Sequence, residues 1–147
     1  MTSLQTNRIS LGDSIYICEK YKGLFNESEC YNNAFKALGH LVLEDKKSNY
    51  VGCIGYVLST DGINKVAVRH AWVKNKYNAI IDVTMPLYDY GIQSILTFEY
   101  LEVCTLTLRD WLEKIEKNNN IPCILNIRGE KKIIEILVKE NFQILGS

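Results

Sequence analysis

The sequence predicts an α+β fold in which a helix packs on an antiparallel sheet. Residues 50–58 are almost wholly apolar, and the apolar segments 68–73 and 80–84 flank a polar break at 74–78. Short apolar runs separated by polar reversals are typical of consecutive antiparallel strands. Just upstream, apolar side chains recur at helical spacing between residues 31 and 42, as in a helix with one buried face. At 147 residues, the chain is long enough to form one domain around its own core.

The composition excludes several functional classes. The chain has 17 basic and 17 acidic residues, so no net charge favours nucleic acid or an anionic membrane as a partner. Residues 1–10 are polar and lack the apolar stretch of a secretion signal. The longest apolar run, 51–58, is too short to cross a bilayer. We therefore expect a cytoplasmic protein, and the sequence does not predict its oligomeric state.

The cysteines are spread along the chain and are odd in number: Cys18, Cys30, Cys53, Cys104 and Cys123. Metal-binding motifs usually place ligands two to four residues apart, and no two of these cysteines are that close. A disulfide framework is equally unsupported. We expect reduced cysteines, most of them buried, and neither a metal site nor a cofactor.

The N-terminal part contains one strong helix signal. Residues 14–19 alternate only weakly and predict either a short edge strand or a helical turn. Farther on, Asn26 with Glu29, or alternatively Ser28, fits an N-cap before an apolar helix face. Either cap places Cys30 in the first turn, where free N–H groups and the helix dipole favour a thiolate. The alternative is that Cys30 is simply a small buried residue.

Gly52 and Gly55, within residues 50–58, indicate close approach of another element.

The two predicted strands that follow carry a pair of polar residues, His70 and Asp82. If the reversal after residue 73 is centred on Lys76, His70 lies directly opposite Asp82 with the two Cβ atoms about 5 Å apart. An imidazole and a carboxylate at that separation can hydrogen bond, which fixes the tautomer and supports the protonated ring.

The remaining elements form the end of the chain. Residues 85–94 predict an aromatic loop whose Tyr88 and Tyr90 either rim a cleft or pack over the sheet edge. Residues 95–107 predict a fourth strand, 108–118 a helix, 121–127 a strand and 129–142 an amphipathic helix. We expect a core of about residues 14–106 and a helix-strand-helix addition of about 107–147. Arg128, Lys131 and Lys132 either bind an anion at the last helix or form a solvated face.

Three of these residues, in the order Cys30, His70 and Asp82, suit nucleophilic catalysis. A thiol nucleophile needs a base, and the base needs an acceptor on its other nitrogen. The segments His-Ala-Trp-Val at 70–73 and Ile-Asp-Val-Thr at 81–84 resemble the H-A-W-V … D-P-T strand pair of bacterial transglutaminase-like domains, within the papain-like cysteine hydrolase superfamily. Residues 29–35 are similar to that group's nucleophile helix, G-x-C-x-x-x-A. The resemblance covers about residues 26–84 and implies Cys30 as nucleophile, His70 as general base and Asp82 as orienting carboxylate.

The sequence departs from this family pattern at two positions. Val83 replaces the proline after the aspartate, and Ser28 replaces the glycine two residues before the cysteine, so a tighter turn there is in doubt. An oxyanion hole would use the Cys30 backbone N–H and a second donor, for which Asn26 and Tyr21 are both candidates. The residues that we expect to contact a substrate are Asn26, Trp72, Tyr88 and Tyr90.

The resemblance implies thiol-dependent acyl transfer through a thioester, on a peptide, protein or small amide substrate. We favour hydrolysis, because transglutamination must exclude water from the thioester and 147 residues leave little chain for a lid. One alternative is a catalytically silent scaffold that binds a small ligand or a partner protein and keeps its affinity after Cys30→Ala. The other is an inert Cys30 beside a satisfied His70–Asp82 pair in the core.

Overall fold

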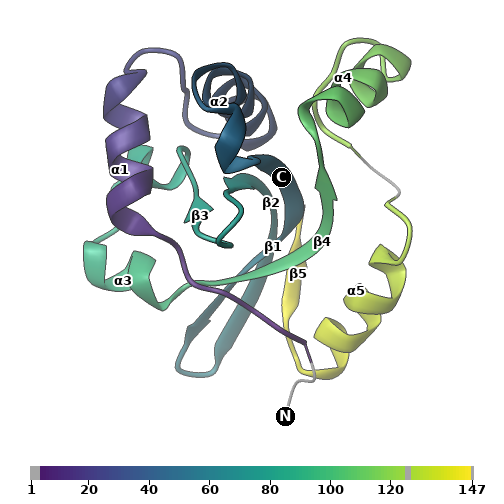
Figure 1. Ribbon diagram of the computed structural model, residues 1–147. Helices are drawn as coiled ribbons and strands as arrows, with labels where there is room; N and C mark the ends of the chain where they lie inside the picture. The colour runs from purple at the N-terminus through teal and green to yellow at the C-terminus, as the bar shows by residue number, and fades with distance from the viewer. Residues whose placement is uncertain (1–3, 125–126, 147) are drawn as a thin grey trace.

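The computed structural model describes residues 4–124 and 127–146 and confirms the α+β class. Its α-helices are α1 (Leu11–Lys20), α2 (Cys30–Glu44), α3 (Ile92–Thr97), α4 (Leu108–Lys117) and α5 (Glu130–Lys139). Its strands are β1 (Val51–Asp61), β2 (Asn64–Lys74), β3 (Ile80–Ile81), β4 (Glu99–Leu106) and β5 (Gln143–Leu145), and η1 (Lys46–Ser48) and η2 (Met85–Leu87) are short 3-10 turns. In Figure 1, α1 and α3 lie to the left of the sheet, α4 and α5 to the right, and α2 at the top between them.

The sheet has the order β3-β2-β1-β4, and all of these neighbours are antiparallel. β1 and β2 pair along their whole lengths. The other edge of β2 is shared, because β5 pairs in parallel with residues 66–68 and β3 pairs with residues 73–74. Within the described residues, positions 69–72 have no strand partner on that edge. His70 lies in this gap.

Two glycines of β1 are required by close packing, as predicted. A Cβ atom on Gly52 would collide with the ring of Trp111, and one on Gly55 would collide with the carbonyl oxygen of Leu101 in β4. The register between β1 and β4 also shifts between Ile54 and Gly55. A bulge of this kind bends the strand and increases its twist, so the sheet curves at this point.

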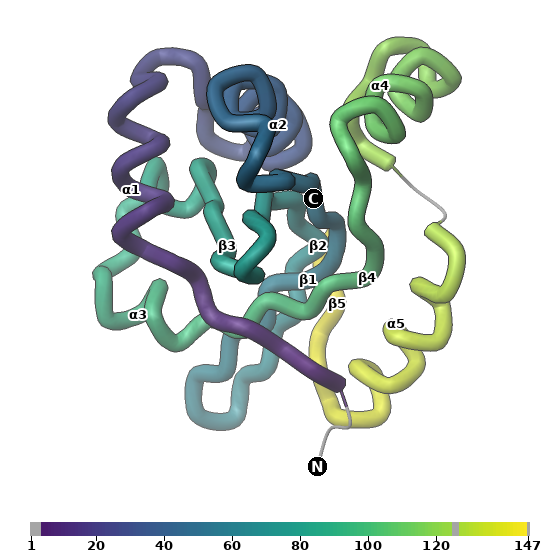
Figure 2. The backbone as a smooth tube through the Cα atoms, viewed as in Figure 1, coloured from purple at the N-terminus to yellow at the C-terminus, as the bar shows by residue number. Residues whose placement is uncertain are grey.

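The N-terminal segment joins the two edges of the curved sheet. Asn7 exchanges two backbone hydrogen bonds with Tyr100 of β4, at 3.0 and 2.7 Å, and the Ser10 N–H donates to the Ile80 carbonyl of β3 at 2.8 Å. β3 and β4 stand at opposite ends of the strand order. One short segment reaches both only because the sheet curls. Figure 2 shows this segment running along the sheet before it enters α1.

Apolar side chains pack on both faces of this curl. One cluster, which includes Leu38, joins α2 and α4 to β1 and β2, and another, around Leu137, lies under α5. A third, which contains Trp72, draws residues from both edges of the sheet and therefore fills its concave side. His70 shares the face of Trp72, because side chains alternate along a strand. The imidazole thus belongs to the concave side.

The predicted hairpin register was wrong by two residues. Val73 pairs with Ile81, whereas a reversal centred on Lys76 would have paired it with Ala79. The Asn75 side chain accounts for the difference, since its Oδ1 accepts backbone N–H bonds from residues 77 and 79 at 2.9 and 3.0 Å and builds a different loop. A shift of two keeps each side chain on its predicted face.

Other predicted segments can be compared with the structure. Residues 14–19 are helical, within α1, which agrees with the second of the two alternatives. The segment 95–107 contains the predicted fourth strand as β4, but its first three residues belong to the end of helix α3. Residues 121–124 and 127 form no strand, and residues 125 and 126 lie outside the described part. Two side chains bind backbone carbonyl groups that a strand partner would otherwise use. Trp111 Nε1 donates to the Pro122 carbonyl at 3.0 Å, and Asn118 Nδ2 donates to the Cys123 carbonyl at 2.9 Å. The C-terminal region supplies its strand after α5 instead, as β5.

Candidate active site

Cys30 is the first residue of α2 and is 5% exposed. The predicted N-caps, Asn26 and Ser28, were wrong: Glu29 takes the N-cap position and makes no side-chain capping bond. The first N–H groups of a helix have no acceptor within the helix. Those of α2 therefore lie beside Cys30 without a capping side chain, where they favour negative charge.

The turn before Cys30 keeps the geometry that the expected glycine would provide. Ser28 has φ = +64°, in the left-handed region that glycine enters without a steric cost and other residues rarely adopt. The Ser28 N–H donates to the Tyr88 hydroxyl at 2.9 Å. This bond holds the turn against the aromatic loop, so a tight turn forms here with serine at position 28.

Asn33, one turn into α2, anchors this loop and was not predicted from the sequence. Its Oδ1 accepts the Asn26 N–H at 3.0 Å, and its Nδ2 donates to the Asn26 carbonyl at 2.7 Å and to Thr84 Oγ1 at 3.0 Å. Asn33 is fully buried. One amide thus fixes the chain before Cys30 to the chain after Asp82.

His70 and Asp82 meet through a 2.7 Å contact between Nε2 and Oδ2. The shifted register makes them diagonal neighbours across β2 and the chain after β3, where long side chains still reach one another. Both residues are buried, at 6% and 1% exposure. The predicted pairing of these two side chains is therefore present, although the predicted path to it was not correct.

Asp82 is held by a complete set of donors. Its Oδ1 accepts the backbone N–H groups of Thr84 and Met85 at 3.0 and 3.1 Å, and its Oδ2 accepts the Tyr100 hydroxyl at 2.6 Å. Its own N–H donates to Ser14 Oγ of α1 at 2.9 Å. Such saturation makes a buried carboxylate tolerable and fixes its orientation.

The electrostatics of this cluster favour a charged imidazole. Burial lowers the pKa of His70, but the charge of Asp82 and hydrogen bonds with Asp82 and Cys30 outweigh burial and raise that pKa to about 10. Burial raises the pKa of Asp82, but the charge of His70 and hydrogen bonds from His70 and Tyr100 lower it below its usual range. Burial and the neighbouring Asp82 raise the pKa of Tyr100 well above its usual range, so its hydroxyl remains a donor.

Cys30 lies beside this pair. It lines the same pocket as His70 and contributes to the raised pKa of the imidazole. Because Nε2 is bound to Asp82, Nδ1 is the ring nitrogen left for an interaction with the sulfur. A cation held beside a thiol by a buried carboxylate is the arrangement that supports a thiolate nucleophile.

A pocket of about 560 Å³ opens over these residues. Cys30 and His70 both line it, together with the predicted substrate contacts Tyr88 and Tyr90. The two tyrosine rings lie 5.5 Å apart, and Tyr90 meets Phe98 edge to face at 5.6 Å. The aromatic loop therefore does rim a cleft, and it forms one wall of it.

Two other predicted contacts lie elsewhere. Trp72 is 1% exposed inside the curl, where its ring is 5.0 Å from that of Tyr100, and it does not line the pocket. Asn26 is exposed and also does not line it. Tyr21 stacks 4.7 Å from His40, which is about 15 Å along α2 from Cys30 at 1.5 Å per residue, so it cannot act as an oxyanion donor.

A buried ion-pair network lies beside the candidate triad. Arg69 contacts the Glu130 carboxylate twice, at 2.8 and 3.0 Å, and donates to the Tyr31 hydroxyl at 2.7 Å. Tyr56 also donates to Glu130. Burial raises the pKa of Glu130, but these hydrogen bonds lower it overall. Arg128, Lys131 and Lys132, near the start of α5, are exposed, which agrees with the predicted solvated face.

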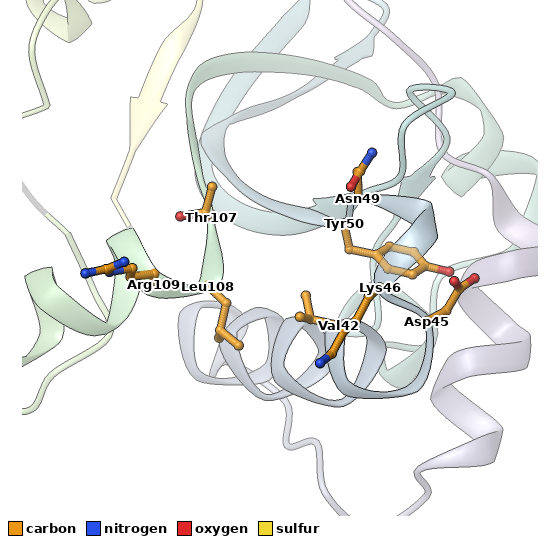
Figure 3. Close-up of a pocket in the computed structure, with 8 residues that line it drawn as sticks. All are labelled: Val42, Asp45, Lys46, Asn49, Tyr50, Thr107, Leu108 and Arg109. Atoms are coloured by element: carbon orange, nitrogen blue, oxygen red, sulfur yellow. The ribbon is translucent and has the colours of Figure 1, made fainter.

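A second hollow, of about 360 Å³, lies away from this site, between the end of α2 and the start of α4. In Figure 3, Tyr50, Asn49 and Asp45 stand on one side of it, and Thr107, Leu108 and Arg109 on the other. Its lining contains no cysteine or histidine. This hollow therefore holds no Cys–His pair.

Comparisons of the chain with models of protein families, with curated proteins and with solved structures return no match. Across residues 4–124 and 127–146, no helix is long and apolar enough to span a membrane. The same residues contain no group of three or more His, Cys, Asp or Glu side chains arranged to hold a metal ion.

Proposed function

We propose that the protein is a thiol-dependent acyl-transfer enzyme that hydrolyses a peptide or amide bond through a thioester. The observation that carries this proposal is the position of His70, which is bound to Asp82 and lines the same pocket as Cys30. A nucleophile at the start of a helix packed on an antiparallel sheet also suits the papain-like and transglutaminase-like core. We propose the chain as a divergent example of that core.

In the acylation step, the Cys30 thiolate attacks the carbonyl carbon, a C–S bond forms, and the carbonyl electron pair moves to oxygen. Collapse of this intermediate breaks the C–N bond, and His70 Nδ1 gives its proton to the leaving nitrogen. Asp82 holds the ring through Nε2 and stabilises the imidazolium.

In the deacylation step, water attacks the thioester carbon and passes a proton to His70 Nδ1. The C–S bond breaks, the acid leaves, and the thiolate is restored. The uncapped N–H groups of the first turn of α2 supply donors for the oxyanion in both steps.

Limiting alkylation tests the proposal without a substrate. The native protein is treated with iodoacetamide from about pH 5 to pH 9, and mass spectrometry measures the labelling rate of each cysteine. Cys18, Cys104 and Cys123 are half-buried, whereas Cys30 is buried. Accessibility alone therefore ranks Cys30 behind these three, so faster labelling of Cys30 requires chemical activation.

We expect Cys30 to label first below about pH 8, and His70→Ala to abolish this preference. His40→Ala is the matched control, because His40 is the second histidine and is exposed. Equal labelling of Cys30 in the wild type and His70→Ala would refute the proposal. Labelling of Cys30 only after unfolding would also refute it.

A further inference from the structure

The pocket has an apolar floor made by one face of two paired strands. Val57 of β1 lies opposite Val68 of β2, and Ser59 lies opposite Val66. All four line the pocket. His70 continues the same face of β2, two residues beyond Val68, because side chains alternate along a strand. The floor thus leads directly to the candidate base.

The walls of the pocket are also largely apolar. On one side stand Met85, Tyr88, Tyr90 and Phe98, and on the other side stand Leu145 and Gly146. The second wall is fixed in place because β5 pairs with residues 66–68 of β2. From Val66 to His70 the strand rises about 13 Å, at about 3.3 Å per residue. A chain of several carbon atoms fits along this length.

The described residues that line the pocket offer no free charge. They include no Asp or Glu, and the two basic residues among them are Arg69 and His70. Arg69 is bound by Glu130 and Tyr31, and His70 is bound by Asp82. A charged group placed along the floor would lose water and meet no counter-charge, which is costly.

We propose that this pocket binds the acyl half of the substrate and that the acyl group is uncharged and apolar. This inference rests on the proposed function, because it takes Cys30 as the atom that the acyl group joins. Both an aliphatic acyl chain and a peptide that ends in an apolar residue have the required chemistry. The test distinguishes these two sources.

Chloromethyl ketones report on this preference without turnover, since the thiolate displaces chloride and forms a C–S bond with the methylene carbon. One series compares 1-chloro-2-octanone with chloroacetone and with anionic 5-chloro-4-oxopentanoate. A second series compares the chloromethyl ketones of acetyl-leucine, acetyl-aspartate and acetyl-lysine. Labelling rates of Cys30 are measured by mass spectrometry and divided by the rate of each compound with glutathione.

We expect the octanone and leucine compounds to label Cys30 at least about tenfold faster than their small or charged counterparts. A larger gain in the first series indicates an acyl chain, and a larger gain in the second indicates a peptide. Equal normalised rates, or faster labelling by a charged compound, would overturn the inference.

Two pocket variants, Val66→Asp and Val68→Asp, place a carboxylate in the floor. Each should remove most of the preference for the apolar compounds. Val138→Asp is the matched control, because Val138 is 57% exposed on α5 and does not line the pocket. A folded pocket variant that keeps the full preference also contradicts the inference.

The two proposals fail in different ways. Loss of the iodoacetamide preference for Cys30 refutes the enzyme itself. A reactive, His70-dependent Cys30 that does not discriminate among the ketones refutes only the apolar acyl pocket.

Discussion

The hydroxyl of Tyr100 donates to Asp82 Oδ2 at 2.6 Å, although the two residues come from opposite edges of the sheet. Tyr100 lies in β4, and Asp82 follows β3. The curl of the sheet, closed by the N-terminal segment, brings them together. The carboxylate that orients His70 is therefore held by the tertiary fold and not only by its own hairpin.

Tyr100→Phe removes this donor and leaves the ring in place. We expect the free energy of unfolding to fall by about 2 kcal/mol, the usual loss for a hydrogen bond to a charged group. Urea unfolding measures the change. Tyr77→Phe is the control, because Tyr77 is 78% exposed and its hydroxyl is solvated. A Tyr100→Phe protein as stable as the Tyr77→Phe protein would show that the bond contributes nothing.

Glu130→Ala leaves the buried Arg69 guanidinium without its carboxylate. An uncompensated buried charge typically costs about 3 kcal/mol or more of stability. Arg69 also binds Tyr31, which follows Cys30, so alkylation of Cys30 should slow as well. The comparison is Glu44→Ala, which breaks a 2.8 Å but exposed pair with Lys20 and should change stability little. Similar effects of the two substitutions would contradict the role of the buried pair.

Asp82→Asn tests the electrostatic basis of the cluster. Without the carboxylate, burial dominates, and the pKa of His70 should fall from about 10 to near or below the ordinary value of about 6.5. A proton NMR titration of the imidazole resonances measures this pKa, and the His40 resonance serves as the internal reference. If the pKa of His70 does not change in this variant, the charge of Asp82 is not the cause of the raised pKa.

The raised pKa of His70 also makes the stability of the fold depend on pH. Because the pKa of His70 is higher in the folded chain than in the unfolded chain, its protonation stabilises the fold. This contribution is complete below about pH 6.5 and is lost as the pH rises through about 10. Wild type should therefore lose more stability than His70→Gln over this range, and the difference between the two proteins cancels the titration of other groups.

Two glycines should respond to alanine in opposite directions. Gly55→Ala places a methyl group against the Leu101 carbonyl and should destabilise the sheet by several times RT, about 2 kcal/mol or more. Gly39 lies in α2, where an added Cβ meets nothing within 4 Å. Gly39→Ala should stabilise the helix by about 0.5–1 kcal/mol. Thermal unfolding of the two variants measures whether each substitution lowers or raises stability. Stabilisation by Gly55→Ala would contradict the close approach of β4 to Gly55.

Part of the site could be predicted from the sequence because side-chain alternation tolerates an error of two residues. The hairpin register was misplaced, yet His70 and Asp82 stayed on one face and met. Local patterns also placed Cys30 at a helix start, although the capping residue was wrong. The placement of Cys30 and His70 in one pocket required the fold, because no local rule joins a helix terminus to this strand.

Other features of the site could not be predicted, because they depend on the curl of the sheet and on contacts between distant segments. Trp72 follows His70 on the same face and was among the residues expected to contact a substrate. The concave side closes over Trp72 instead, with Tyr100 against its ring. Asn33 and Tyr100 could not be chosen from the sequence, because their partners Thr84 and Asp82 lie 51 and 18 positions away and come near only in the folded chain.

The parallel pairing of β5 with residues 66–68 has a consequence for synthesis. One wall of the pocket, Leu145 and Gly146, is among the last parts of the described chain to be made. Chains are made from the N-terminus, and pairings between distant segments form late. A nascent chain that already contains Cys30, His70 and Asp82 therefore lacks a closed pocket. Under the proposed function, Cys30 gains a closed binding site only after this region has been translated.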